Sequence, residues 1–233
     1  MPAVSIVSRE DAARLTARAL LEVGAVALRP DAPFTYTSGL KSPVYVDCRK
    51  LISYPRIRAT LVELFAATVA REMGLERFDA IAGGETAGIP FAAWLADRLA
   101  LPMQYVRKKP KGFGRNAQIE GDIAAGQRTL LVEDLATDGG SKLRFAAALR
   151  EAGAEVSHCL VVFHHDIFAD SEARLAAEGL SIHALARWSD VLAAAAAGGG
   201  FDQSALGEVQ SFLSAPLAWS ASRGGIDRLD GGL

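Results

Sequence analysis

Two acidic residues followed by a short glycine-rich loop form the part of the sequence best suited to chemistry. Glu133 and Asp134 end an apolar run, and the loop from Thr137 to Ser141 comes before apolar residues return at helical spacing. The backbone amides of such a loop, with the partial positive charge of a helix start, can bind a phosphate group. Adjacent carboxylates would repel that phosphate unless they bind sugar hydroxyls or a divalent cation. The combination therefore predicts a site for a ribose phosphate.

A buried strand and a helix must position these residues. The run Leu130–Val132 is apolar on both faces, as expected of a parallel strand inside a sheet. Open α/β sheets bind ligands at the carboxyl ends of their strands, which is where the two acids fall. Ser141 is a plausible N-cap for the helix, and Gly153 ends it. The alternative is an ordinary strand-to-helix turn with an acidic strand end, and neither common glycine motif of nucleotide-binding loops is present.

A second unit of the same kind precedes the first. Residues 79–82 predict a short strand, residues 83–88 a glycine-rich loop, and residues 89–99 a helix. Further apolar strands are predicted at residues 102–106 and 156–163. Repeated strand–loop–helix units indicate a parallel, doubly wound sheet in an α/β protein.

A strongly cationic segment follows the predicted strand at residues 102–106. Five Lys or Arg residues occur between Arg107 and Arg115, interrupted by Pro110 and two glycines, which excludes a stable helix and predicts a mobile loop. A solvated run of charge is one explanation. The loop leaves the same edge of the sheet as the phosphate-type loop, which favours a lid over a polyphosphate.

The remaining sequence predicts helices and a tail. Helices are expected at residues 8–24, from Ser53 or Pro55 to Gly74, and at 171–178, 189–197 and 203–213, the last capped by Asp202; residues 220–233 are expected to form a frayed tail. His164, His165 and Asp166 follow the strand at 156–163. Adjacent histidines on an extended segment point to opposite faces, which argues against one shared metal ion.

Composition narrows the class of protein. The chain has 233 residues, a net charge of −2, 50% hydrophobic and 22% charged residues, which fits a single α/β domain and argues against nucleic-acid binding. Cys48 and Cys159 give neither a disulfide framework nor zinc-ligand spacing. We find no secretion signal and no apolar run of about 18 residues. We therefore expect a cytoplasmic protein without a membrane partner.

Three segments resemble one family. Residues 129–142 resemble the phosphoribosyl pyrophosphate (PRPP) signature of type I phosphoribosyltransferases, residues 37–49 resemble the amino-terminal signature of the orotate phosphoribosyltransferases, and residues 105–121 resemble their catalytic loop. Asp138 departs from the signature, because it places a carboxylate in the loop expected to hold the 5′-phosphate. The resemblance implies a mostly parallel central sheet flanked by helices, with a small base-binding hood formed by about residues 1–50.

The resemblance also implies an activity: transfer of phosphoribose from PRPP to orotate, giving orotidine 5′-monophosphate and pyrophosphate in pyrimidine biosynthesis. Mg²⁺ would be held mainly by PRPP, without a dedicated set of protein ligands. A homodimer is implied, with the loop at 107–116 acting on the partner's site. Two alternatives stay open, a PRPP-binding regulator and a purine phosphoribosyltransferase, although the latter lacks a segment like 37–49.

Site residues follow from the matched motifs. The catalytic cations would be Lys111, Arg107 and Lys108. PRPP would be bound by Glu133, Asp134, Thr137, Gly139, Gly140, Ser141, Glu85, Thr86, Ala87 and Gly88. Orotate would be bound by Thr37, Ser38, Gly39, Lys41, Tyr45 and Thr137. Thr37 stands where one branch of the family has lysine, so Lys41 or Arg49 is expected to supply the cation, and Phe113 stands where many members have histidine.

Overall fold

A parallel sheet forms the centre of the protein. The computed structural model describes residues 7–36, 38–110, 118–168, 171–198 and 201–228. Within those residues the central sheet has six strands in the order β10-β9-β8-β5-β6-β7, and all neighbours are parallel except β6 and β7. The strands are β5 (Ala80–Gly84), β6 (Met103–Val106), β7 (Ile119–Glu120), β8 (Arg128–Ala136), β9 (Glu155–His164) and β10 (Ser181–Arg187). The predicted mostly parallel α/β fold is confirmed.

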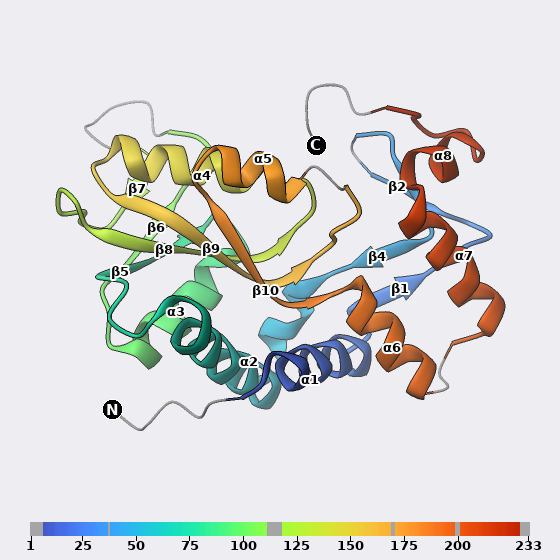
Figure 1. The fold of residues 1–233 in the computed structure, drawn as a ribbon, viewed down its shortest axis with the longest axis horizontal. Coiled ribbons are helices and arrows are strands. Elements are labelled where there is room, and N and C mark those ends of the chain that lie inside the picture. The colour runs from blue at the N-terminus through green and yellow to red at the C-terminus, as the bar shows by residue number, and fades with distance from the viewer. Residues whose placement is uncertain (1–6, 37, 111–117, 169–170, 199–200, 229–233) are drawn as a thin grey trace.

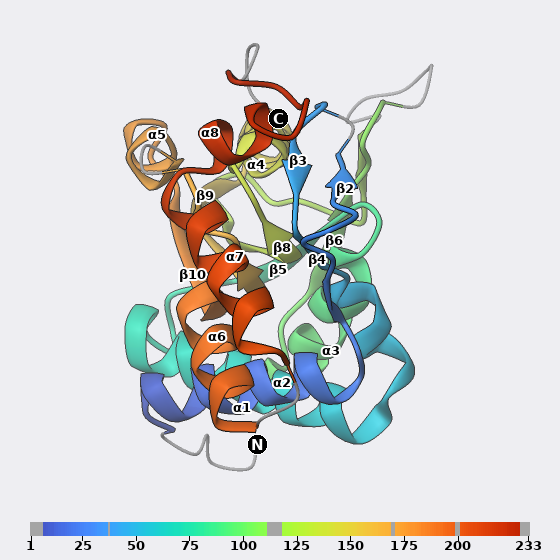
Figure 2. The same ribbon diagram turned by 90° about the vertical axis from the view of Figure 1, so that its right-hand side faces the viewer.

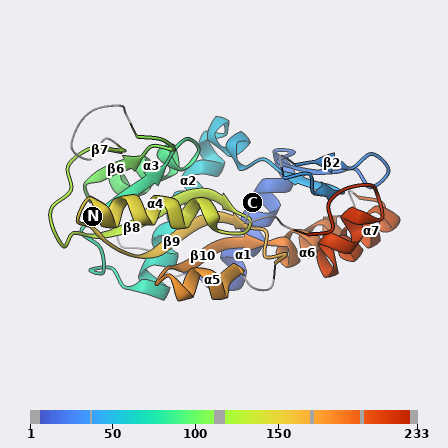
Figure 3. The same cartoon turned by 90° about the horizontal axis from the view of Figure 1, so that it is seen from above.

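Helices cover both faces of this sheet (Figures 1 and 3). One face carries α1 (Arg9–Glu22), α2 (Pro55–Thr68) and α3 (Gly88–Leu99); the other carries α4 (Gly140–Glu151) and α5 (Ser171–Ala177). The apolar interior is correspondingly divided into two clusters. Phe65 of α2 and Phe91 of α3 meet edge to face in the first, while Phe145 and Leu149 of α4 pack in the second. The buried apolar residues of α2, α3 and α4 therefore lie in these two clusters.

A smaller assembly lies beside the end of the sheet (Figures 1 and 2). We call its four short strands the hood: β1 (Val26–Leu28), β2 (Phe34–Thr35), β3 (Lys41–Ser42) and β4 (Val44–Val46). β1 pairs with β4 and β2 with β3, both antiparallel. The remaining elements are the short helices η1 (Cys48–Ser53) and η2 (Val69–Met73), and α6 (Trp188–Gly198), α7 (Gln203–Ser214) and α8 (Pro216–Ala221). No described helix is long and apolar enough to cross a membrane.

Two predicted strand ends were wrong by several residues. β5 includes Gly83 and Gly84, which had been placed in the following loop, and β8 continues to Ala136, beyond the two acids. The reason for the second difference is pairing, because Ala136 is in register with His164 of β9. Ser141 is also not the N-cap: Gly139 holds that position with a φ of 84°, a conformation that favours glycine.

The C-terminal segment differs most from its prediction. Residues 181–187 form β10 and residues 216–221 form α8, neither of which had been expected. The expectation of a frayed tail from Ser220 onward is wrong for residues 220–226, since Ser220 is fully buried and the Ile226 amide donates to the Gly39 carbonyl at 3.3 Å. Residues 229–233 lie outside the described part of the chain.

The two adjacent histidines diverge, as predicted. His165 packs against Trp188, whose Nε1 donates to His165 Nδ1 at 3.2 Å. The ligand atoms of His164, Asp166 and Glu172 lie within 4.8 Å of one another. Arg187 already pairs with both of these carboxylates, at 2.5 and 2.6 Å. The acids therefore have a cationic partner in the fold.

His165 should make the stability of the protein depend on pH. Burial lowers the pKa of His165 to about 3, below the usual value of 6.5. Between these two values the unfolded chain binds a proton at this residue and the folded chain does not. Stability should therefore be full above pH 6.5 and fall as the pH drops toward 3, by about 2 kcal/mol between pH 6.5 and 5 from this residue alone. Urea titrations at pH 7, 6 and 5 give the free energy of unfolding at each pH. This free energy should fall less steeply with falling pH in His165→Gln than in the wild type. Equal slopes for the two proteins would contradict the assignment.

Candidate active site

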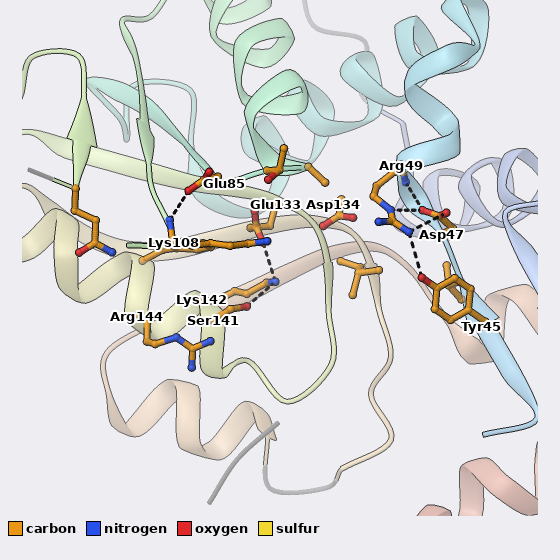
Figure 4. A pocket seen from close by; sticks show the side chains of 16 residues that line it. Tyr45, Asp47, Arg49, Glu85, Lys108, Glu133, Asp134, Ser141, Lys142 and Arg144 are labelled. Carbon is orange, nitrogen blue, oxygen red and sulfur yellow. Dashed lines mark hydrogen bonds and ion pairs between the residues drawn. The ribbon is translucent and has the colours of Figure 1, made fainter. Parts of the chain in front are cut away.

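The strand order reverses between β5 and β8. The chain leaves β5 through α3 to reach β6 on one side, while β8 pairs with the other side of β5. Such switch points leave a crevice at the carboxyl ends of the strands. A cavity of about 530 Å³ lies here (Figure 4), lined by Tyr45, Val46, Asp47, Arg49, Glu85, Thr86, Ala87, Lys108, Gln118, Glu133, Asp134, Leu135, Ser141, Lys142, Arg144 and Phe145.

A buried ion pair forms the floor of this cavity. Lys142 Nζ, from the first turn of α4, lies 2.9 Å from Glu133 Oε2, and both residues are only about 5–6% exposed. Burial raises the pKa of Glu133 to about 7, and the nearby Lys142 ammonium offsets part of this rise. Lys142 also donates to the Ser141 hydroxyl at 3.1 Å. No pattern in the sequence indicates that Lys142 is buried in the site.

Two glycines make room for Glu133. A Cβ atom at Gly84 would overlap Glu133 Oε1, and a Cβ at Gly88 would meet both that oxygen and, at 2.5 Å, the Val132 carbonyl oxygen. Glu133 Oε1 is buried and has no hydrogen-bond partner among the described residues. Gly84 and Gly88 are therefore required by close packing around the carboxylate.

Gly88→Ala should destabilise the protein. The new methyl group overlaps the β8 backbone, and overpacking of this kind costs about 1–3 kcal/mol. Gly207→Ala is the matched control, because a Cβ there meets nothing within 4 Å and lies inside α7, where alanine is favoured. Thermal unfolding of both variants measures the difference. A Gly88→Ala protein as stable as the control would mean that β8 can move away at no cost.

Asp134 stands next to the ion pair and faces the cavity. Burial raises the pKa of its carboxyl group, with Lys142 and Arg49 acting in the opposite direction. Figure 4 shows Glu133 and Asp134 between the α4 side of the cavity and the hood side. The predicted acid pair therefore lies in the cavity, although inside β8 rather than after it.

Asp138 does not project as a free charge into the phosphate-type loop. Its Oδ1 accepts a hydrogen bond from the Gly140 amide at 3.1 Å. Arg174 of α5 donates to the Asp138 carbonyl at 3.0 Å and lies 3.7 Å from Oδ2. The departure from the PRPP signature is thus accommodated by an amide of the loop and by a neighbouring guanidinium.

The base of the cationic segment reaches the same cavity. The Lys108 amide donates to Glu85 Oε2 at 2.6 Å, which joins the segment to the loop after β5, and the Glu85–Thr86 peptide is cis. Arg107 instead pairs with Glu120 at 3.5 Å and is not among the lining residues. Lys111 lies outside the described residues.

The hood supplies the opposite wall. Arg49 contacts both oxygens of Asp47, at 2.6 and 3.1 Å, and donates to the Tyr45 hydroxyl at 3.2 Å. This contact holds the pKa of Asp47 below its usual range. The Tyr45 ring also packs at a tilt against the rings of Phe34 and Tyr36, with centroids 5.4 and 6.3 Å apart. The cavity therefore has an aromatic and guanidinium wall, which suits a planar anionic ring.

The structure brings together some predicted site residues and separates others. The cavity lining includes Tyr45, Glu85, Thr86, Ala87, Lys108, Glu133, Asp134 and Ser141. It does not include Ser38, Gly39, Lys41, Gly88, Arg107, Thr137, Gly139 and Gly140, while Thr37 lies outside the described residues. Missed lining residues are Val46, Asp47, Gln118, Leu135, Lys142, Arg144 and Phe145. Arg144 could have been predicted as a lining residue, because it lies one helical turn after the glycine loop. The other missed residues come close to the cavity only in the folded chain.

The charged groups of the cavity are better suited to binding a polyanionic sugar than to nucleophilic catalysis. Four cationic side chains, those of Arg49, Lys108, Lys142 and Arg144, line the cavity with the carboxylates of Asp47, Glu85, Glu133 and Asp134. The group of possible metal ligands found among the described residues, at His164, contains none of the lining residues. The geometry is suited to binding charge and hydroxyls.

Comparison with known proteins gives the class and then the particular family. A phosphoribosyl transferase domain matches residues 57–182, which include both glycine-containing loops of the cavity. With the parallel sheet and the acid pair at its switch point, this match shows that the chain belongs to the phosphoribosyltransferases.

Within that family the chain belongs to the orotate phosphoribosyltransferases. It is 61% identical to the orotate phosphoribosyltransferase of Cereibacter sphaeroides (strain KD131 / KCTC 12085) over 92% of this chain and 93% of that one. It is 59% identical to that of Ruegeria sp. (strain TM1040) over 91% and 94%. The crystal structure of the Aeropyrum pernix orotate phosphoribosyltransferase matches with a TM-score of 0.67 and 34% identity, over 79% of this chain and 99% of that one.

Proposed function

We propose that the switch-point cavity transfers phosphoribose from PRPP to orotate, releasing pyrophosphate and forming orotidine 5′-monophosphate for pyrimidine biosynthesis. The observation that carries this proposal is that one cavity joins the acid pair Glu133–Asp134 to the hood wall of Tyr45 and Arg49. The acids suit ribose hydroxyls, and the wall suits a planar carboxylate-bearing base.

The two substrates occupy the two sides of the cavity in this proposal. The ribose of PRPP lies against Glu133 and Asp134, with its 5′-phosphate toward the amides of residues 137–141. Its pyrophosphate lies toward Lys108 and the loop of residues 85–88. Orotate lies against the hood, with Tyr45 beside the ring and Arg49 as the cation; Ser38, Gly39, Lys41 and Thr37 remain predictions from resemblance.

In the reaction, the bond between C1 of ribose and pyrophosphate breaks, a bond from C1 to a ring nitrogen of orotate forms, and the proton of that nitrogen passes to the released pyrophosphate. Positive charge grows on the sugar, and the carboxylates of Glu133 and Asp134 stabilise it. Negative charge grows on the leaving pyrophosphate, and Lys108 stabilises that charge. The assignment of Lys111 and Arg107 to the same task stays a prediction from the catalytic-loop resemblance.

Mg²⁺ fits this site as an ion carried mainly by PRPP. Carboxylate oxygens are the ligand type that Mg²⁺ takes, and the Asp134 carboxylate in the cavity lining would supply one, whereas Glu133 Oε2 is already paired with Lys142. When bound, the ion neutralises pyrophosphate charge.

A homodimer that shares the loop at 107–116 is proposed from the family resemblance. Two buried free cysteines support a reducing, cytoplasmic location.

The proposed reaction can be tested by mixing the protein with orotate, PRPP and Mg²⁺ and following orotate's ultraviolet absorbance. Loss of absorbance should require all three components, and uracil, adenine and hypoxanthine should give no product. Product from adenine or hypoxanthine would overturn the assignment of the base. Binding of PRPP without turnover of any base would instead favour a regulator.

A further inference from the structure

The C-terminal segment after α7 is fitted against the hood. α8 lies against β3 (Figure 2), and the Lys41 amide of β3 donates to the Ser220 hydroxyl of α8 at 3.0 Å. Ser220 is 0% exposed. Further along, the Ile226 amide donates to the Gly39 carbonyl at 3.3 Å. Two backbone groups of the hood loop at residues 38–41 are thus satisfied by residues about 180 positions later.

The fit between the two segments leaves little space. A Cβ atom at Gly225 would overlap Ser220 Oγ and lie 2.6 Å from Lys41 Cγ. A Cβ at Gly39, whose φ is +87°, would lie 3.0 Å from Ile226 Cγ2. The loop at 38–41 therefore cannot move toward the tail without displacing it.

α8 is itself held firmly. Trp219 is 5% exposed, packs edge to face on Phe212 of α7, and donates to Glu208 at 3.1 Å. Arg223 lies 3.7 Å above the Trp219 ring and pairs with the same glutamate at 2.6 Å. The segment that contacts the hood loop thus has a rigid support in α7.

The hood loop leads to the cavity through aromatic contacts. Lys41 pairs with Thr35 in the β2–β3 ladder, next to Phe34. The rings of Phe34 and Tyr36 both contact the ring of Tyr45, which lines the cavity. A shift of the loop backbone would therefore be transmitted to the wall against which the base is placed.

We propose that Ser220 is a positioning residue for the base half of the site: it fixes the backbone at Lys41 and, through the aromatic contacts, the place of Tyr45. The inference rests on the proposed function, in which the hood wall binds orotate. Removing the Ser220 hydroxyl leaves the Lys41 amide without its acceptor. The PRPP side of the cavity, built on β5, β8 and α4, has no contact with this segment in the hydrogen bonds described above.

Steady-state kinetics of Ser220→Ala test this role. The KM for orotate should rise by about 5- to 30-fold, the range expected for loss of one buried hydrogen bond, while kcat and the KM for PRPP change less than about twofold. Gly225→Ala should act in the same direction by displacing the tail. Ser222→Ala is the matched control, since it removes an exposed hydroxyl whose hydrogen bonds among the described residues are to its own segment, to Trp219 and Arg223.

The outcomes separate this inference from the proposed function. If the wild-type enzyme consumes orotate but Ser220→Ala keeps the wild-type KM for orotate, the positioning role is overturned and the proposed function stands. A fall in kcat and a rise in both KM values by similar factors, accompanied by a lower Tm, would show that Ser220 is only a structural residue. That result would also overturn the positioning role. A wild-type protein that does not consume orotate overturns both.

Discussion

Asp134→Asn should lower kcat/KM for the forward reaction by on the order of 10²-fold or more. The substitution keeps the size of the side chain and removes the negative charge that we propose faces the ribose. Asp134 lies in the cavity beside the buried Glu133–Lys142 pair, where the loss of a charge is weakly screened by water. Most of the effect should fall on kcat, because the sugar becomes most positive in the transition state.

A matched variant separates this effect from a general change of charge. Asp97→Asn, on the exposed side of α3, makes the same chemical change far from the cavity lining and should leave kcat/KM within about twofold. Initial rates at saturating and limiting PRPP measure both quantities. Wild-type kinetics in Asp134→Asn would remove this residue from the proposed mechanism.

Lys142→Met should destabilise the fold by about 3–5 kcal/mol, because it leaves the Glu133 carboxylate buried without its cation. The pKa of Glu133, already about 7 through burial, should rise further. When the pKa of a carboxyl group is higher in the folded than in the unfolded protein, the protein loses stability as the pH rises past the unfolded pKa. The deficit of Lys142→Met against wild type should therefore be larger at pH 8 than at pH 5.

Denaturant titrations at both pH values measure this prediction. The double variant Glu133→Gln/Lys142→Met should recover much of the lost stability, since no buried charge remains. Lys109→Met, which removes an exposed lysine, is the control and should change stability by less than about 0.5 kcal/mol. A deficit that is the same at both pH values would show that Glu133 is not left charged.

The main architecture could be predicted because it depends on local patterns. The apolar run before Glu133 and the short strand at Ala80 are buried on both faces, so composition alone indicated parallel strands. β10 was missed because it lies at the edge of the sheet, where the alternation of buried and exposed residues is weak. The end of β5 is set by its register with β6 and the end of β8 by its register with β9, and the sequence does not state either pairing.

The acid pair could be predicted for the same reason, and its surroundings could not. Lysine is seldom buried, so nothing in the sequence distinguishes Lys142 from a surface lysine until α4 is packed on β8. The contact between Lys41 and Ser220 spans 179 positions, and no local pattern predicts it. The hood was expected from the first 50 residues alone, but α8 completes it.

A crystal structure with PRPP bound, solved with Mg²⁺ present, tests the central assignment most directly. We expect the ribose hydroxyls to lie within hydrogen-bond distance of Glu133 or Asp134, and the 5′-phosphate to accept hydrogen bonds from the amides of residues 137–141. PRPP bound with its ribose away from both carboxylates, or outside the cavity between β5 and β8, would contradict it.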